Sequence, residues 1–417
     1  MMLTPPPGAD ARGAYLPELA GLVWPAPARP ALRRGGRAGF AVVPSAARPR
    51  LLVPAGSRRA AAGAVRHSTE AQSAKARLRR AVLATAFRTG LGRLAFRDRL
   101  VVDAGGNAGD SGGGALDAHL AAVLGRPALL SIHIGPARAN RKPVVQLLDA
   151  AGVPIGYAKL GVDPLTRALV EAEAAALARL ATLAVPGVQV AEVLHHGVWG
   201  GHALLVQSAL PVGLPRAAPA PAAEAERAAM VAVSRCVGVD HRPYAGSAHD
   251  RRLGAELAAL GDRPEAARLR AVLDEVRRVD PVLGLGAWHG DWNGGNSAAL
   301  ADGRVLVWDW ERFADDVPLG FDALHRRVQT AITRAGVEPR AAAARLIAGA
   351  TDDLTPFGQP AGVADLVAVL YLVELAARYL RDRQAEAGAR LGHVDAWLLP
   401  AVEEHLAGRP GAGGVAK

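Results

Sequence analysis

The chain has 417 residues, of which 50% are hydrophobic, and a formal net charge of +10 at pH 7. This length suits two or three domains, no run reaches the roughly 18–20 apolar residues that a membrane span needs, and a single cysteine, Cys236, excludes an internal disulfide or a cysteine-built zinc site. The N-terminus lacks the charged start and apolar core of a secretory signal, so we expect a cytoplasmic protein that does not bind membranes.

The positive charge does not by itself indicate a nucleic-acid-binding protein. Almost all of it comes from arginines that are spread along the chain, and aromatic residues make up only 4% of the sequence. Single-strand binders combine a basic groove with stacking aromatics. Only four lysines and four asparagines occur in the whole chain, so one of them at a motif position is informative.

The first 126 residues divide into two segments of different character. Residues 1–38 are rich in Pro, Ala, Gly and Arg and are expected to be mostly flexible, with one short helix over residues 15–23. Residues 39–126 are expected to form an accessory α/β segment. Its predicted elements are strands over 40–43 and 51–53, a helix over 70–89, a strand ending at 101–102, and a helix over 115–124.

A glycine-rich loop, residues 104–114, lies inside this accessory segment. Such loops can bind phosphates when they join a strand to a helix. This one has neither the Gly-Lys-Ser/Thr ending of a Walker loop nor the G-x-G-x-x-G spacing. A linker or surface loop is therefore favoured over a nucleotide-binding loop.

From residue 127 to 212 the pattern is that of a β-rich lobe. Short apolar runs at 129–134, 143–148 and 154–160 predict three strands, and the third contains Lys159. A helix over 165–183 follows and contains Glu171 and Glu173. Two further strands are predicted over 188–194 and 203–206, before a Pro/Ala linker at 211–222.

Residues 213–407 are expected to form a mainly helical lobe, and residues 408–417 a disordered tail. Helices are predicted over residues 223–236, 253–260, 264–279, 321–335, 339–350, 362–385 and 394–406.

The most informative stretch, residues 287–311, interrupts these helices. His289-Gly290-Asp291 is followed, five residues after the aspartate, by Asn296. Two short apolar runs around a turn at 301–303 then predict a hairpin, whose second strand ends at Asp309. Two carboxylates and an amide oxygen at the end of a hairpin suit Mg²⁺ binding on a nucleotide and the orientation of a hydroxyl.

This arrangement resembles the aminoglycoside phosphotransferase family, the kinase-like small-molecule kinases. The resemblance is specific at HGD-x-x-x-x-N and at the strand end Trp308-Asp309-Trp310-Glu311, and it extends over roughly residues 127–406. It implies an α+β, protein-kinase-like bilobal fold with a β-rich N-lobe and a mainly α C-lobe. The N-terminal α/β accessory segment would be an addition in a divergent member.

The resemblance also implies roles for the residues of the C-lobe. Asp291 would be the catalytic acid/base that orients the acceptor hydroxyl, and Asn296 and Asp309 would bind the metal ions. His289 would hold the loop through hydrogen bonds to the backbone. Asp322, in a Pro-Leu-Gly-Phe-Asp-Ala-Leu stretch, would brace the same loop.

In the N-lobe the resemblance implies a lysine–glutamate pair that fixes the α- and β-phosphates. Lys159 would be the lysine, and Glu173, which opens a Glu-Ala-Ala-Ala-Leu run, is favoured over Glu171 as its partner. The turn at 135–142 has one glycine where kinases have three. Phosphate contacts there would come from backbone amides, with candidate side chains Arg138, Asn140, Arg141 and Lys142.

The implied activity is transfer of the γ-phosphoryl group of ATP or GTP, with Mg²⁺, to a hydroxyl of a small molecule. The main alternative is a catalytically degenerate kinase-like protein that binds a nucleotide or metabolite. Two others remain open: a protein-directed kinase or nucleotidylating enzyme on the same fold, and a nucleic-acid-binding role for the basic N-terminal 126 residues. The acceptor is not identified by the sequence.

Overall fold

The computed structural model describes residues 4, 8–67, 74–103, 115–136 and 140–409. The chain divides into two compact units. The first contains residues 1–178 and 191–213, and the second contains residues 179–190 and 214–417. Within the described residues, no helix has both the length and the apolar character required to cross a membrane.

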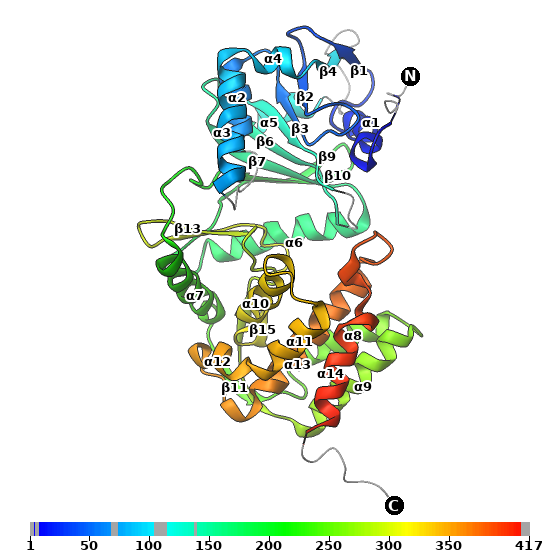
Figure 1. Ribbon diagram of the computed structural model, residues 1–417, viewed down its shortest axis with the longest axis vertical. Helices are drawn as coiled ribbons and strands as arrows, with labels where there is room; N and C mark the ends of the chain where they lie inside the picture. Colours follow the sequence, from blue (N-terminus) through cyan, green and yellow to red (C-terminus); the bar gives the residue numbers. More distant parts are fainter. Residues whose placement is uncertain (1–3, 5–7, 68–73, 104–114, 137–139, 410–417) are drawn as a thin grey trace, which may run out of the picture. The chain divides into compact units, whose positions relative to one another are not determined.

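The first unit is built on a nine-stranded sheet (Figure 1). The strand order is β1-β4-β2-β3-β5-β6-β7-β10-β9, and neighbouring strands are antiparallel. The bounds are β1 Arg29–Arg34, β2 Phe40–Val43, β3 Leu51–Pro54, β4 Asp98–Asp103, β5 Leu129–His133, β6 Val144–Leu148, β7 Pro154–Gly161, β9 Val193–Trp199 and β10 His202–Ser208.

Helices cover both faces of this sheet because its strands alternate apolar side chains between the two faces. Val42 and Leu52 pack in one cluster with helices α1 (Ala11–Val23) and α5 (Leu116–Leu124). Their neighbours in the strands, including Val53, pack on the other face, in a cluster with α2 (Arg58–Arg66) and α3 (Ala74–Thr89). The remaining helices of this unit are α4 (Gly92–Ala95) and α6 (Pro164–Leu180), whose last two residues belong to the second unit.

The N-terminal segments differ from what the sequence indicated. Residues 1–38 contain strand β1 as well as a helix, so they are not mainly irregular where the structure describes them. The accessory strands join the same sheet as β5–β7, because β3 pairs with β5 at Leu51 with His133 and Leu52 with Ile132. The change of sequence pattern at residue 127 therefore marks no break in the fold. The glycine-rich loop at 104–114 lies outside the described residues.

One predicted strand has a different place. Residues 188–194 were expected to form the fourth strand of the N-lobe sheet. Instead, β8 (Val188–Gln189) belongs to the second unit and runs parallel to β14 (Val305–Val307), while β9 is the strand that pairs with β10. Because β8 has only two residues and lies close to β9 in the sequence, the apolar pattern alone does not separate the two strands.

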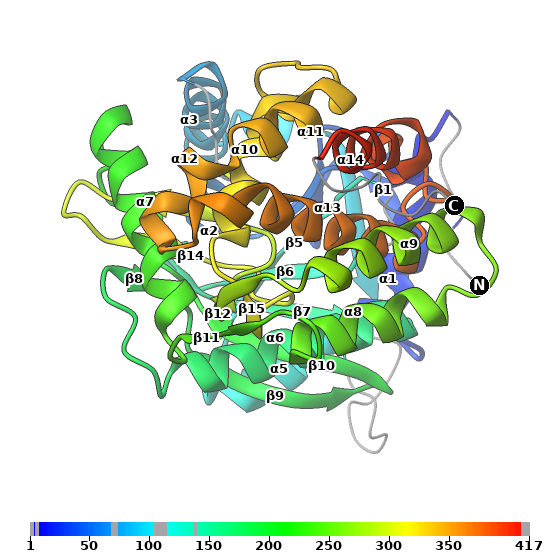
Figure 2. The ribbon, with the colours of Figure 1, turned by 90° about the horizontal axis from the view of Figure 1, so that it is seen from below.

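The second unit is mainly helical. Its helix α13 (Ala364–Arg381) is buried along almost all of its length, as expected for a helix that is apolar on every side. It contacts α8, α9, α10, α11 and α14, which surround it in Figure 2. The bounds are α7 Pro219–Arg235, α8 Ala248–Ala259, α9 Pro264–Val279, α10 Phe321–Thr333, α11 Pro339–Ala348, α12 Ala350–Leu354 and α14 Leu398–Ala407, with short 3₁₀ turns at 355–357, 361–363, 390–392 and 394–396.

Two small sheets complete this unit. One has the order β11-β12-β15, formed by Asp240–Pro243, Val282–Trp288 and Ala314–Pro318. The other has the order β13-β14-β8, with β13 at Ser297–Ala299. The predicted hairpin is therefore present as β13 and β14, and the loop that carries the HGD motif runs from the end of β12 to the start of β13.

Candidate active site

The loop between β12 and β13 is a compact turn held by its own side chains. The Asn296 side-chain amide donates to the backbone carbonyl of Asp291 at 3.0 Å and to its carboxylate Oδ2 at 2.8 Å. The Asn293 amide also donates to the Asp291 carbonyl, at 3.1 Å. The two asparagines therefore hold the backbone carbonyl of Asp291, and Asn296 also bonds one oxygen of its carboxylate.

Gly290 allows the loop to turn at the centre of the motif. Its φ of +87° lies in the left-handed region that favours glycine. A Cβ at this position would also lie too close to the backbone carbonyl oxygen of Arg312. Glycine is thus required here for two independent reasons.

His289 is a buried connector between the loop and β14. Its Nδ1 accepts the backbone N–H of Asp291 at 3.1 Å, so the proton of a neutral ring must be on Nε2, which lies 3.0 Å from the carbonyl of Trp308. The rings of Trp292 and Trp310 contact it edge-to-face. The orientation of this imidazole is therefore fixed by packing as well as by hydrogen bonds.

Helices α10 and α13 brace the loop from outside. The carboxylate of Asp322, in the first turn of α10, accepts the backbone N–H groups of His289 at 2.7 Å and of Gly290 at 3.1 Å. Burial raises the pKa of Asp322, while these two N–H groups and His289 act in the opposite direction. From α13, the buried guanidinium of Arg378 donates to the carbonyl of Gly290.

The carboxylate of Asp291 is held on both oxygens yet stays accessible. Oδ2 accepts from Asn296, and Oδ1 lies 3.0 Å from Nε2 of His325. The side chain keeps a relative exposure of 39%, so a small molecule can reach it. Burial opposes its ionisation, but the hydrogen bond from His325 and the positive charge of Arg378 keep the pKa of Asp291 below its ordinary value. The group is a carboxylate at neutral pH.

Asp309 follows β14 in an unusual backbone conformation. Its φ of +64° is one of few positive values at non-glycine residues in the described chain, and aspartate tolerates this region better than most residues. The backbone N–H of Trp308 donates to the carbonyl of Asn296 at 3.1 Å, which ties this strand end to the HGD loop.

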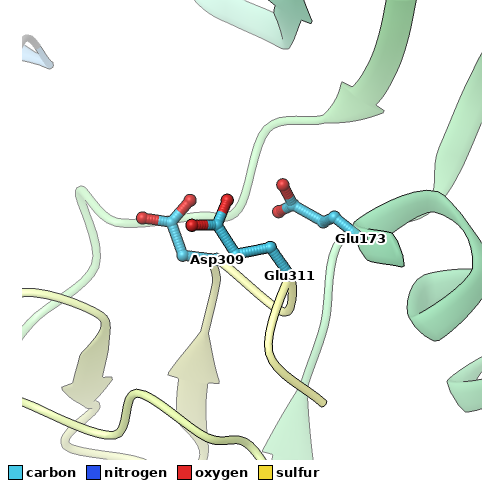
Figure 3. Close-up of side chains that lie close together, drawn as sticks. All are labelled: Glu173, Asp309 and Glu311. Carbon is cyan, nitrogen blue, oxygen red and sulfur yellow. The ribbon is translucent and has the colours of Figure 1, made fainter. Parts of the chain in front are cut away.

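The residues around Asp309 suit a divalent cation. Carboxylate oxygens of Asp309 and Glu311 lie within 4.8 Å of each other, side by side in Figure 3. Asn296 uses its amide nitrogen for both hydrogen bonds described above, and a cation would take its carbonyl oxygen. Oxygen donors of this kind are those that Mg²⁺ prefers, so the donor set fits the implied metal.

The first unit carries a buried lysine–glutamate pair. Nζ of Lys159, on β7, lies 2.6 and 2.7 Å from the two carboxylate oxygens of Glu173, on α6. Lys159 is 4% exposed and Glu173 is fully buried, whereas Glu171 is exposed. Glu173 is therefore the glutamate on this helix that bonds the lysine.

The turn between β5 and β6 contains the remaining predicted phosphate contacts. Asn140 and Lys142 are both half-buried there, and Arg138 lies outside the described residues. The guanidinium of Arg141 stacks over the ring of Tyr15 on α1, at 3.6 Å from the ring centroid. Arg141 is thus engaged with the N-terminal helix.

Three site residues had no assignment from the sequence: His325, Tyr371 and Arg378. They come from α10 and α13, up to 88 residues from the HGD loop. For His325 a signal existed, because it follows Asp322 by three residues and so lies on the same face of a helix. Tyr371 and Arg378 sit in a long apolar helix with nothing local to distinguish them.

No protein-family model and no curated protein sequence matches the chain. Solved structures do resemble it at low sequence identity. A thermostable mutant of aminoglycoside phosphotransferase APH(4)-Ia, in its apo form, is 13% identical, with 70% of this chain and 100% of that chain covered and a TM-score of 0.47. The same protein in ternary complex with AMP-PNP and hygromycin B is 13% identical, with 72% and 99% covered and a TM-score of 0.44.

A third similar structure is choline kinase LicA from Streptococcus pneumoniae. It is 11% identical, with 70% of this chain and 98% of that chain covered and a TM-score of 0.45. These proteins are kinase-like small-molecule kinases of mixed α+β fold.

Proposed function

We propose that this protein is a phosphotransferase that moves the γ-phosphoryl group of a magnesium-bound nucleoside triphosphate to a hydroxyl of a small molecule. The observation that carries the proposal is the Asp291 carboxylate. It is ionised and accessible, and it is held by Asn296, whose backbone carbonyl is bonded by the strand end that precedes Asp309. A fixed carboxylate beside oxygen donors for a cation is what hydroxyl phosphorylation requires.

In the proposed reaction, Asp291 accepts the proton of the acceptor hydroxyl. The hydroxyl oxygen forms a bond to the γ-phosphorus, and the bond from that phosphorus to the β–γ bridging oxygen breaks. The nucleoside diphosphate leaves with the electron pair. Phosphoryl transfer needs mainly positioning and charge neutralisation, and a rigid loop supplies the first.

Asn296 and Asp309, with Glu311, would hold Mg²⁺, which when bound neutralises phosphate charge. Lys159, held by Glu173, would bind the α- and β-phosphates as a compact positive charge. Asn140 and Lys142 would contribute to phosphate binding from the β5–β6 turn. The nucleotide would be ATP or GTP.

The test is turnover of ATP and of GTP, with Mg²⁺, against a panel of sugars, aminoglycosides and amino alcohols. Release of nucleoside diphosphate and the mass of the phosphorylated acceptor would be measured. We expect acceptor-dependent release that is lost on chelation of the metal and in Asp291→Asn and Asp309→Asn. Asp291→Asn should still bind nucleotide, because the variant keeps the size of the side chain.

Asp302→Asn is the matched control, since Asp302 is exposed on the β13–β14 turn and pairs with Arg304. It should keep wild-type turnover. Full activity in Asp291→Asn, or the absence of nucleotide binding to the wild-type protein, would contradict the proposal. Nucleotide binding without turnover on any acceptor would favour a kinase-like binding protein instead.

A further inference from the structure

Asn296 alone does not fix the orientation of the Asp291 carboxylate. It bonds Oδ2, and a carboxylate held by one oxygen can still rotate about its Cβ–Cγ bond. His325 supplies the second point, because its Nε2 lies 3.0 Å from Oδ1. The side chain of His325 is 1% exposed and lies on α10, whose first turn contains the Asp322 that braces the same loop.

The hydrogen-bond pattern determines which nitrogen of His325 carries the proton. An ionised carboxylate only accepts, so the Nε2 of His325 must donate to Asp291. Its other nitrogen, Nδ1, lies 3.0 Å from the hydroxyl of Tyr371 on α13. In the neutral ring this nitrogen accepts, and Tyr371 is then the donor. Burial keeps the pKa of Tyr371 well above its ordinary value, so its O–H is retained.

The groups that face His325 agree with a neutral ring. Burial lowers the pKa of His325, the adjacent carboxylate of Asp291 raises it, and the positive charge of Arg378 lowers it further. The resulting chain runs from the Tyr371 hydroxyl through the imidazole to the carboxylate. Its first two members are buried, and its last is the exposed group.

We propose that His325, oriented by Tyr371, is a positioning residue that holds the Asp291 carboxylate in the orientation in which it accepts the proton of the acceptor hydroxyl. This inference rests on the proposed function, since it specifies how Asp291 is made ready for that step. His325 itself touches neither acceptor nor nucleotide in this role, and it acts through Asp291 alone.

The same unit contains a matched control. Tyr244, His249 and Glu374 form a second buried tyrosine–histidine–carboxylate chain, with the Tyr244 hydroxyl 2.9 Å from Nδ1 of His249 and Glu374 3.3 Å from its Nε2. This chain does not include Asp291. Replacement of His249 should therefore show how much stability is lost when a buried histidine of this kind is removed, without an effect on catalysis.

The experiment compares His325→Leu, His325→Gln, Tyr371→Phe and His249→Leu by steady-state kinetics and thermal melting. Leucine fills the space but cannot donate, whereas glutamine can place an amide N–H near the position of Nε2. We expect His325→Leu to lose about 10- to 100-fold in kcat with KM for the nucleotide nearly unchanged, the loss typical of a misplaced catalytic group. His325→Gln should recover most of this kcat, and Tyr371→Phe should show a smaller loss.

His249→Leu should lower the melting temperature but keep kcat per folded molecule. Nitrogen-15 NMR of labelled histidines, with His325→Gln used for assignment, should show His325 as the neutral Nε2–H form. Wild-type kcat in His325→Leu, an equal loss in His325→Gln, or the Nδ1–H form would overturn the inference alone. A wild-type protein that phosphorylates no acceptor would instead overturn the proposed function and this inference with it.

Discussion

At the scale of single residues, the site depends on a few positions where only one side chain fits. Gly290 is the clearest case, because both its backbone angle and the nearby carbonyl of Arg312 exclude a Cβ. Asp309 differs from Gly290, because it has a side chain although its backbone lies in the left-handed region that favours glycine.

Replacement of Gly290 by alanine should therefore disrupt the loop. Gly303, on the β13–β14 turn, is a matched control because its φ of +88° is nearly the same and a Cβ there would meet nothing within 4 Å. In both variants, alanine in this left-handed conformation should lower the free energy of unfolding by about 1–3 kcal/mol. The free energy of unfolding of Gly290→Ala should be lower by about 1–3 kcal/mol more, which is the usual cost of overpacking.

Urea unfolding of the two variants and the wild type would measure this difference. Equal stability of the two variants would show that the close approach of Arg312 is relieved at no cost. We also expect Gly290→Ala, but not Gly303→Ala, to lose turnover.

At the scale of elements, the ion pair of Lys159 and Glu173 connects β7 to α6. Both side chains are buried, so removal of one partner leaves the charge of the other buried without this ion pair. Lys159→Met should therefore lower the free energy of unfolding by about 3–5 kcal/mol. The double variant Lys159→Met/Glu173→Leu should be more stable than Lys159→Met, because no charge is left buried.

Denaturant unfolding of wild type, both single variants and the double variant would check this as a double-mutant cycle. A double variant that is less stable than Lys159→Met would contradict it. All of these variants should lose phosphotransfer. The double variant would then regain stability without regaining activity, which separates the two roles of the pair.

The HGD loop shows how elements from distant parts of the chain combine. Asp322 at the start of α10 and Arg378 on α13 satisfy backbone groups of this loop, which has no regular structure of its own. Buried backbone groups need such partners. The loop is thus rigid because two helices complete its hydrogen bonds.

At the scale of the whole molecule, histidines that lose contact with water on folding make stability depend on pH. Burial is the largest cause of a lowered pKa at six histidines in the two units. These are His67, His119, His133, His202, His325 and His405. Their ordinary value is 6.5. Between 6.5 and the lower folded-state pKa the unfolded chain binds more protons, so the free energy of unfolding falls as pH falls.

We therefore expect the melting temperature to be lower at pH 5.5 than at pH 7.5 by at least about 2 °C, the shift that roughly 1 kcal/mol produces in units of this size. Burial raises the pKa of Glu256, Asp322 and Asp353, and these carboxyl groups oppose the histidines from their ordinary values of 3.8–4.5 upward, so the expected shift is the net of the two effects. His133→Gln should reduce the shift. An unchanged or higher melting temperature at pH 5.5 would contradict the expectation.

Local sequence pattern determined a large part of this protein. The short apolar runs that predicted β2, β3, β5, β6 and β7 are strands, and the hairpin after the HGD motif is present. These elements follow from side-chain periodicity and turn residues, which act over a few positions. The motif formed by Asp291, Asn296 and Asp309 could also be recognised from the sequence, because these residues lie close together along the chain.

The tertiary structure alone decided what depends on contacts between distant segments. It placed the N-terminal strands in the same sheet as β5, and β8 beside β14 in the second unit. It also brought His325 to the Asp291 carboxylate, 34 residues away, and Tyr371 to His325. Strand order and the partners of a buried polar group are set by packing over the whole unit, and the local pattern showed only that His325 shares a helix face with Asp322.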